Sequence, residues 1–336
     1  MTSIRPRPTT ITDIARRAGV STATVSYVLN DAPAGARIPE STRARVRAIA
    51  DELGYVPHAS ARSLRTGSSD LVLHVQIDAV QGPLASEFLH RLTRSLRELG
   101  YTLMQYGAER NRGVKAARTW ASMRPAAVIA GYDRLTPAGI DLLRRSDIQV
   151  IAVGVDAAEV KGTGVSTLTM DNEGVGAEAA RHLLERGYRD LAAVVPAEGP
   201  VREMGEGRLE GLREAAAAAG ATVRRHEMDW SPESAGEIVR TWLDEGLPEG
   251  VFGYNDEFGG LLLGALLDAG VRVPEQVGLV GADDVMLCRM LRPRLTSVRL
   301  ESESSDQVAR RIVAAVTERT EVHLSPWTPV LVRRDT

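Results

Sequence analysis

A short run of small polar side chains near residue 25 has the composition of a surface that reads nucleic acid. Hydroxyl and phenol groups can bond phosphates and base edges, and short side chains let a helix enter a groove closely. Helical spacing places Val25 and Val28 on the opposite side of the same segment, where they can anchor it. We therefore predict a major-groove surface made by Ser21, Thr22, Ala23, Thr24, Ser26 and Tyr27.

A second group of polar residues directly follows apolar runs that predict strands farther along the chain. These residues are Asp78, Asn255 and Asp283, which follow the runs at 71–77, 250–254 and 276–281. In open sheets of parallel strands, ligands bind beyond the carboxyl ends of the strands. The sequence therefore predicts a small-molecule site at these positions, to which we assign Gln81 from the loop after the first run.

Two arginines and a tryptophan complete the predicted ligand site. Arg202 and Arg208 lie six residues apart at the start of a predicted helix, and forked guanidinium groups bond hydroxyl groups or carboxylates. Trp230 offers a flat apolar face against which a sugar ring can lie. Each residue also has a structural alternative, because Asp and Asn often cap turns and a single Trp is usually part of a core.

Three short helices are predicted to position the first surface. Thr10 and Asp13 form a capping box at the start of one helix, and Gly19 supplies the turn that ends it. Ser21 can cap a second helix at 22–29. A third helix follows Pro39, with apolar residues at helical spacing, namely Val46, Ile49, Ala50 and Leu53. Two helices joined by a tight turn predict a helix-turn-helix.

From residue 70 the pattern changes to strands and helices in alternation. Apolar runs near 71–77, 101–106, 126–130 and 148–153 are separated by amphipathic stretches, and a second series runs from 190 to 281. Such alternation predicts parallel sheets covered on both faces. The units could form one barrel or two open sheets, and the polar break at residues 162–174 favours two sheets.

Charge and composition limit the possible functions. Residues 1–69 hold ten arginines and five acidic residues and are therefore basic, whereas the remainder is acidic; this asymmetry suggests a polyanion partner for the head. A single cysteine and scattered histidines predict neither disulfides nor a metal site. We find no dinucleotide fingerprint, phosphate-binding loop or nucleophile elbow, so we expect no cofactor and no enzyme. With no apolar leader or long apolar run, we expect a cytoplasmic bacterial protein associated with the nucleoid.

The chain resembles the lactose/galactose-repressor (LacI/GalR) family over almost its whole length. The resemblance is carried in the head by TITDIARRAGVSTATVSYVLN (10–30), LGYVP (53–57) and ARSL (61–64), and in the body by RLEG (208–211), ND (255–256) and GADD (281–284). It implies a small all-α helix-turn-helix head and an α/β body of two doubly wound parallel-sheet subdomains, of the periplasmic-binding-protein type. It further implies a hinge helix in which Leu64 is a minor-groove wedge.

The resemblance also implies domain limits and contact residues. We expect a DNA-binding domain at 1–56, a hinge at 57–69 and an effector-binding and dimerisation domain at 70–336. Its N-subdomain would span about 70–168 and 299–323, and its C-subdomain about 169–298 and 324–336. Further DNA contacts are expected from Asn30, Tyr55, Ala61, Leu64 and Arg65, and effector contacts from Arg208, Trp230, Asn255 and Asp283.

These observations predict a transcriptional regulator that represses by binding pseudo-palindromic operator DNA as a homodimer. A small effector, a sugar or related metabolite, would control it from a cleft between the subdomains. The same architecture acting with a co-repressor or as an activator stays open, as does, more distantly, a solute-binding module. Two departures from the family pattern affect the expected pocket: the loop at 78–83 lacks Asn-Pro-Phe, and residue 300 is Leu.

Overall fold

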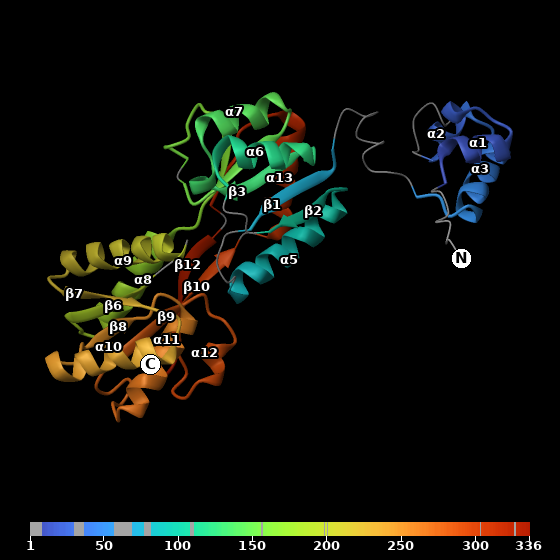
Figure 1. Cartoon of the computed structure of the whole chain (residues 1–336). Helices are drawn as coiled ribbons and strands as arrows, with labels where there is room; N and C mark the ends of the chain where they lie inside the picture. The colour runs from blue at the N-terminus through green and yellow to red at the C-terminus, as the bar shows by residue number, and fades with distance from the viewer. Residues whose placement is uncertain are drawn as a thin grey trace, which may run out of the picture. The chain divides into compact units, whose positions relative to one another are not determined.

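The computed structural model describes the two parts of the chain separately (Figure 1). It covers residues 9–29, 37–56, 69–76, 82–107, 111–155, 157–197, 199, 201–302, 304–325 and 327–336. The chain divides into two compact units, Met1–Ser69 and Asp70–Thr336. We call the first unit the head and the second unit the body.

The head contains the three helices that the sequence predicts. They are α1 (Ile11–Ala18), α2 (Thr22–Leu29) and α3 (Glu40–Glu52). Thr10 caps α1 through a complete capping box with Asp13, and Gly19 ends it with φ 65°. Glycine adopts this left-handed backbone conformation at little cost in free energy, so the chain can turn sharply into α2. Apolar residues from all three helices form the head core, namely Ile14, Ala15, Ala18, Val25, Val28, Val46 and Ala50.

The first sheet of the body consists of parallel strands in the order β11-β5-β4-β3-β1-β2. These strands are β1 (Leu71–Val75), β2 (Thr102–Tyr106), β3 (Ala127–Gly131), β4 (Gln149–Val153), β5 (Val165–Leu168) and β11 (His323–Leu324). Its helices are α5 (Pro83–Glu98), α6 (Gly113–Ser122), α7 (Pro137–Arg145) and α13 (Ser305–Glu318). Helices α5 and α13 cover one face, and α6 and α7 cover the other (Figure 1).

The second sheet has the order β12-β10-β9-β8-β6-β7, in which only β12 is antiparallel to its neighbour. These strands are β6 (Asp190–Pro196), β7 (Thr222–Met228), β8 (Gly250–Phe252), β9 (Gly278–Ala282), β10 (Thr296–Ser302) and β12 (Trp327–Val332). Helices α8 (Asn172–Glu185) and α9 (Val201–Ala218) cover one face. Helices α10 (Pro232–Glu245) and α11 (Asp256–Asp268) cover the other, with the short α12 (Leu287–Met290) beside them. Two sheets, rather than one barrel, are confirmed.

In the described part of the body, the chain passes between the sheets three times. The passages follow β5, β10 and β11. We expected the second passage near residue 299, but β10 stays in the second sheet until Ser302 because it pairs with β12 from Ser297 to Ser302. The first and third passages are tied together, since the Thr169 N–H donates to the Leu324 carbonyl at 2.8 Å.

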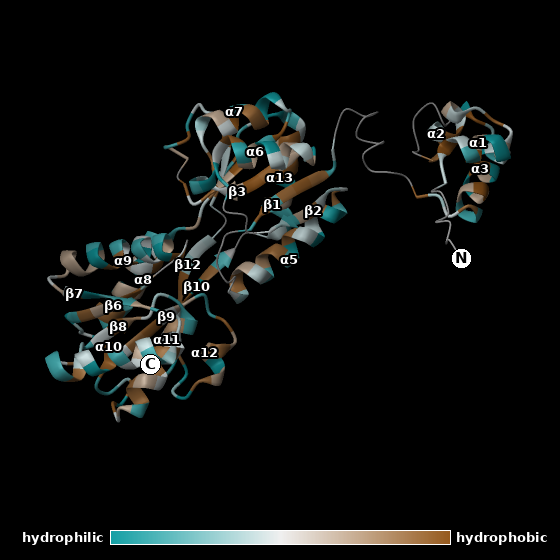
Figure 2. Cartoon of the chain, in the orientation of Figure 1, coloured by the Kyte–Doolittle hydropathy of each residue, from teal (hydrophilic) through white to brown (hydrophobic). Residues whose placement is uncertain are grey.

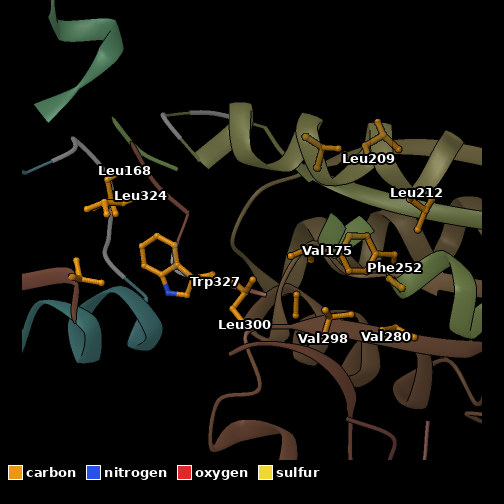
Figure 3. Packing of buried hydrophobic residues seen from close by; sticks show 14 of the residues in the cluster. Leu168, Val175, Leu209, Leu212, Phe252, Val280, Val298, Leu300, Leu324 and Trp327 are labelled. Carbon is orange, nitrogen blue, oxygen red and sulfur yellow. The ribbon is translucent and has the colours of Figure 1, made fainter. Parts of the chain in front are cut away.

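One apolar cluster runs through both sheets. Leu168 and Leu324 from the first sheet pack in the same cluster as Leu300 and Trp327 from the second, and Figure 3 shows the indole between the two groups. In Figure 2 inner strands such as β1 and β9 are mostly hydrophobic, whereas the outer strand β7 is hydrophilic. This pattern is typical of parallel strands buried on both faces.

Candidate functional site

The exposed face of α2 carries the small polar side chains that the sequence analysis singles out. Ser21, Thr22 and Ala23 are exposed, and Thr24 and Ser26 are partly buried. The Ser21 hydroxyl accepts the Thr24 N–H at 3.0 Å and therefore caps the helix. This face lies opposite the buried Val25 and Val28, as the helical spacing predicts.

Two tyrosines of the head, Tyr27 and Tyr55, are among the expected DNA contacts. The ring of Tyr27 is 41% exposed on α2. Tyr55, also expected to contact DNA, is partly buried against the head core. Four other expected DNA contacts lie outside the described residues, namely Asn30, Ala61, Leu64 and Arg65.

In the body, Arg208 joins four segments at one end of the second sheet. Its side chain is buried, with 3% of the residue exposed. Nε donates to the Asn172 amide oxygen at 3.2 Å, Nη1 to the Tyr254 carbonyl at 2.8 Å and Nη2 to the Asp283 carboxylate at 3.1 Å. Nη2 also lies 3.8 Å from the Met170 sulfur. The guanidinium is therefore fixed from three directions.

The charges in this cluster compensate one another. Burial is the largest single effect and lowers the pKa of Arg208. The charges of Asp283, Tyr254 and Asp256 and the hydrogen bond to Asp283 together outweigh it, so the pKa lies above its ordinary value. The guanidinium carbon also lies 4.9 Å from the centre of the Tyr254 ring, an additional cation–π contact. Asp283 keeps 16% of its side chain exposed, so it can present acceptor capacity to a ligand while held by Arg208.

Unusual backbone conformations place the partners of Arg208. Tyr254 and Asp283 have φ of 48° and 96°, a region that non-glycine residues seldom adopt. Such strain persists where surrounding contacts over-determine it, and it concentrates at functional sites. Asn255, the next predicted ligand residue, caps α11 by accepting the N–H groups of Glu257 and Phe258. Its amide oxygen is thus already used by the helix.

A buried carboxyl group supports the loop that carries Asp283. Asp256 is 1% exposed, and it accepts the Ser297 hydroxyl at 2.6 Å and the Val285 N–H at 2.8 Å. Burial raises the pKa of Asp256 to about 7, and the hydrogen bond from Ser297 only partly offsets this rise. The same Ser297 hydroxyl accepts the Asp284 N–H at 3.0 Å. Asp256 therefore fixes the loop from the interior side.

The structure does not bring Arg202 and Arg208 together. Arg202 donates to the Ala197 carbonyl and pairs with Glu227 on β7 and with Glu206 on α9. Six helical residues correspond to about 600°, so the two side chains leave α9 in different directions. Glu206 and Glu227 are also bound by Arg225 of β7. Arg202 thus belongs to a surface ion-pair network.

Trp230 lies in the turn between β7 and α10 and is 58% exposed. The predicted aromatic face is therefore available to solvent at this end of the sheet, and no contact between Trp230 and Arg208 is observed in the described residues. Asp78 and Gln81 lie outside the described residues.

A cavity of about 420 Å³ opens beside Asp283, between the two sheets. One wall comes from α5 and the other from β10 and the loop after β9. Apolar side chains meet charged ones here, and the lining residues are Leu84, Glu87, Phe88, Arg91, Asp283, Asp284, Arg299, Leu300, Glu301, Ser305 and Trp327. The rings of Phe88 and Trp327 lie 4.9 Å apart. The cavity therefore offers aromatic surface together with hydrogen-bonding groups of both charges.

Sequence reasoning missed several members of the site. Asn172 and Tyr254 were not singled out as partners of Arg208, and Asp284 was not recognised as a residue whose buried carboxylate is held by Arg334 and Arg299. Asn172 lies in the polar stretch that the sequence marks as a break, a usable signal. The Tyr254 contact uses a backbone carbonyl, which no side-chain pattern encodes.

The part of the chain that the structure describes shows neither a metal-binding cluster nor a membrane-spanning helix. These residues contain no group of three or more His, Cys, Asp or Glu side chains that could hold a metal ion. None of their helices combines the length and apolar character needed to span a membrane.

The fold and these sites define a regulator with a helix-turn-helix head and a ligand-binding body. Residues 10–58 match the family described as bacterial regulatory proteins, lacI family, and residues 180–336 match a periplasmic binding protein-like domain. The chain is 30% identical to the HTH-type transcriptional repressor PurR of Proteus mirabilis over 308 residues, covering 89% of this chain and 88% of that protein.

Two solved structures are similar over nearly the whole chain. The transcriptional regulator CelR in complex with cellobiose is 27% identical, with a TM-score of 0.65 and coverage of 98% and 99% of the two chains. The lac repressor dimer bound to operator and an anti-inducer is 22% identical, with a TM-score of 0.77 and the same coverage.

This chain belongs to the LacI family of bacterial regulatory proteins. It is a DNA-binding transcriptional repressor with an effector-binding domain, and the expectation that it is not an enzyme is confirmed by these relatives. The resemblance and the fold class inferred from the sequence are likewise confirmed.

Proposed function

We propose that two copies of this chain bind the halves of a pseudo-palindromic operator through α2, and that a small effector bound beside Asp283 changes operator affinity. The observation that carries the proposal is that Asp283, which lines the cavity between α5 and β10, pairs with the buried Arg208 at 3.1 Å. A ligand that contacts Asp283 would act on a group linked through Arg208 to Asn172, at the passage between the sheets.

For the DNA side, the proposed contacts are the predicted ones on α2, with Tyr27 as the largest exposed group. The hinge residues Ala61, Leu64 and Arg65 and the linker at 57–69 complete the proposed interface. Arg16 supports this assignment, because 77% of its side chain is exposed and its acidic neighbour Asp13 lies 3.8 Å away. An arginine so exposed can exchange a weak ion pair for a phosphate.

For the effector side, we propose a sugar or related polar metabolite. The cavity presents carboxylate and guanidinium groups in pairs, for example Arg91 with Glu87 and Arg299 with Glu301. Such pairs supply hydrogen-bond acceptors and donors without net charge, which suits hydroxyl groups. The cellobiose complex of the similar regulator supports the same class. We place the repressor in the cytoplasm, on the nucleoid.

The first test measures DNA binding. Fragments of the host genome bound in a gel-shift assay supply the operator, and fluorescence anisotropy then follows its affinity between 50 and 200 mM salt. With several arginine–phosphate contacts in each of two heads, the log–log slope should be on the order of −4 to −10. A slope near zero would refute DNA as the partner.

The second test measures the effector response. A thermal-shift panel of pentoses, hexoses, cellobiose and nucleobases identifies a ligand, which is then titrated against the labelled operator complex. Arg208→Met should leave operator affinity near that of the wild type and abolish the response, because the effector can shift the two states only through differential contacts. Arg202→Ala is the matched control and should retain the response. A full response in Arg208→Met would refute the site.

A further inference from the structure

Two glycines lie where α8 crosses α9, and neither position has room for a side chain. A Cβ atom on Gly176 of α8 would lie 1.7 Å from the carbonyl oxygen of Arg208 on α9. A Cβ atom on Gly211 of α9 would lie 1.9 Å from the carbonyl oxygen of Glu173 on α8. Both neighbours are backbone atoms of helices, which cannot rotate away as a flexible side chain can. Each helix therefore rests directly on the backbone of the other.

This crossing lies at the same place as the Arg208 cluster. The carbonyl that faces Gly176 belongs to Arg208 itself, and a Cβ atom on Gly207 would meet Cβ of Asn172 at 3.2 Å. Asn172 is in turn the partner of Arg208 Nε. Helices normally pack with axes 8–10 Å apart, according to the side chains between them. Without side chains at the contact, α9 approaches closely enough for Arg208 to reach the first turn of α8.

The size of the clash shows what a methyl group would do. An ordinary contact begins near 3.4 Å, so a methyl at Gly176 requires a separation of about 1.7 Å more than the structure has. If α9 moves outward, Arg208 leaves Tyr254 and Asp283; if α8 moves instead, Asn172 recedes from Arg208. Hydrogen bonds of 2.8–3.2 Å do not survive such a displacement.

We propose that Gly176 and Gly211 are positioning residues of the effector site, which hold Arg208 in reach of Asn172, Tyr254 and Asp283 at once. This inference rests on the proposed function, which assigns Arg208 and Asp283 to effector binding. Glycine inside a helix otherwise costs stability, roughly 0.5–1 kcal/mol relative to alanine, so a gain elsewhere must justify it here.

Other helical glycines provide matched controls. A Cβ atom on Gly236 of α10 or on Gly264 of α11 would meet nothing within 4 Å, and neither residue has a positive φ. Alanine at these two positions should keep or raise the melting temperature Tm, since it restricts the unfolded chain and improves helix propensity. Comparing Gly→Ala at the crossing with Gly→Ala at these control positions therefore distinguishes the effect of the backbone clash from the effect of helix propensity.

The experiment is a double-mutant cycle on the full chain, followed by thermal denaturation. Gly176→Ala and Gly211→Ala should each lower Tm by roughly 10 °C or more, whereas Gly236→Ala and Gly264→Ala should not lower it. In an Arg208→Met background the loss at the crossing should shrink to about half, because the Arg208 contacts are already absent. If Gly211→Ala does not fold, Gly207→Ala is the milder variant. Its Cβ atom would lie 3.2 Å from Cβ of Asn172, which is a close contact but not an overlap.

A spectroscopic measurement checks the geometry without any ligand. The buried Arg208 Nε–H should give an exchange-protected ¹H–¹⁵N signal that disappears in Arg208→Lys. This signal should shift or lose protection in the crossing variants and stay unchanged in the two controls. Additive Tm losses together with an unchanged Arg208 signal would overturn the proposal, leaving a packing role only.

Ligand binding is measured separately with ribose, cellobiose, adenine and guanine as probes. A probe that raises the Tm of the wild type should lose at least half of that shift in Gly211→Ala and keep it in Gly236→Ala. A full shift in Gly211→Ala would overturn the assignment to the effector site. If no probe shifts the wild type, the effector class of the proposed function fails, and the cycle still decides whether the glycines position Arg208.

Discussion

Asp256 gives the sharpest test of the electrostatics, because its substitution by asparagine removes a titration and almost nothing else. The amide can present its oxygen to the Val285 N–H and its NH₂ group to the Ser297 hydroxyl, which accepts instead of donating. Size and shape are conserved, so the cavity and loop should stay in place.

The magnitude follows from the pKa of Asp256, which burial raises from 3.8 to about 7. Between about pH 4 and pH 7 the folded protein keeps a proton that the unfolded chain has lost. Because the folded state binds more protons, its stability falls as pH rises through this window, by about 1.4 kcal/mol per pH unit. A rise of about three units amounts to roughly 4 kcal/mol.

The assay is urea denaturation of the wild type and Asp256→Asn at half-unit steps from pH 4 to pH 8. The difference in unfolding free energy should move in favour of the variant by about 4 kcal/mol up to pH 7 and then level off. All other titrating groups are shared, so they cancel in the difference. A difference that stays constant with pH would refute the buried, protonated carboxyl.

The remaining predictions concern the head and two arginines of the body. Tyr27→Ala should weaken operator binding by roughly 1–3 kcal/mol and binding to random DNA much less; equal losses in anisotropy titrations would mean that Tyr27 contacts only the backbone of DNA. Gly19→Ala should destabilise the head by about 1–2 kcal/mol, because Gly19 has a φ of 65°. Hydrogen exchange of the α1 amides measures this loss, and unchanged protection would contradict the prediction. Arg208→Met should lower the free energy of unfolding by about 3–5 kcal/mol, because it leaves Asp283 unpaired. Arg202→Ala, in an exposed network, should lower it by less than about 1 kcal/mol. Equal losses in urea denaturation would contradict the difference in burial between the two arginines.

The three helices of the head could be predicted from the sequence because their signals are local. Thr10 with Asp13 and Gly19 encode the limits of α1 through capping and the left-handed turn. Buried positions at helical spacing then set which face of α2 is exposed. No long-range contact is needed to reach these conclusions.

The body site could be predicted only in part, since its geometry depends on contacts between distant segments. Strand-end position correctly marked Asp283 as a polar residue at this end of the sheet, and the structure brings it to Arg208; contact of either with an effector stays a prediction. The separation of Arg202 from Arg208 follows from helix rotation, which a count of residues overlooks. The backbone carbonyl of Tyr254 and the backbone contacts of Gly176 carry no side-chain signal at all.

The charged residues on β7 have a consequence for the behaviour of the protein at high concentration. β7 is the outer strand of its sheet, and an outer strand can recruit a strand from another molecule and start aggregation. Arg225 and Glu227 lie on β7 within the ion-pair network, and Arg224 of the same strand is paired with Asp190. Burying these charges against a second chain would remove their hydration at a cost in free energy. The ion-pair network that contains Arg202 therefore also opposes edge-to-edge association of this sheet with another chain.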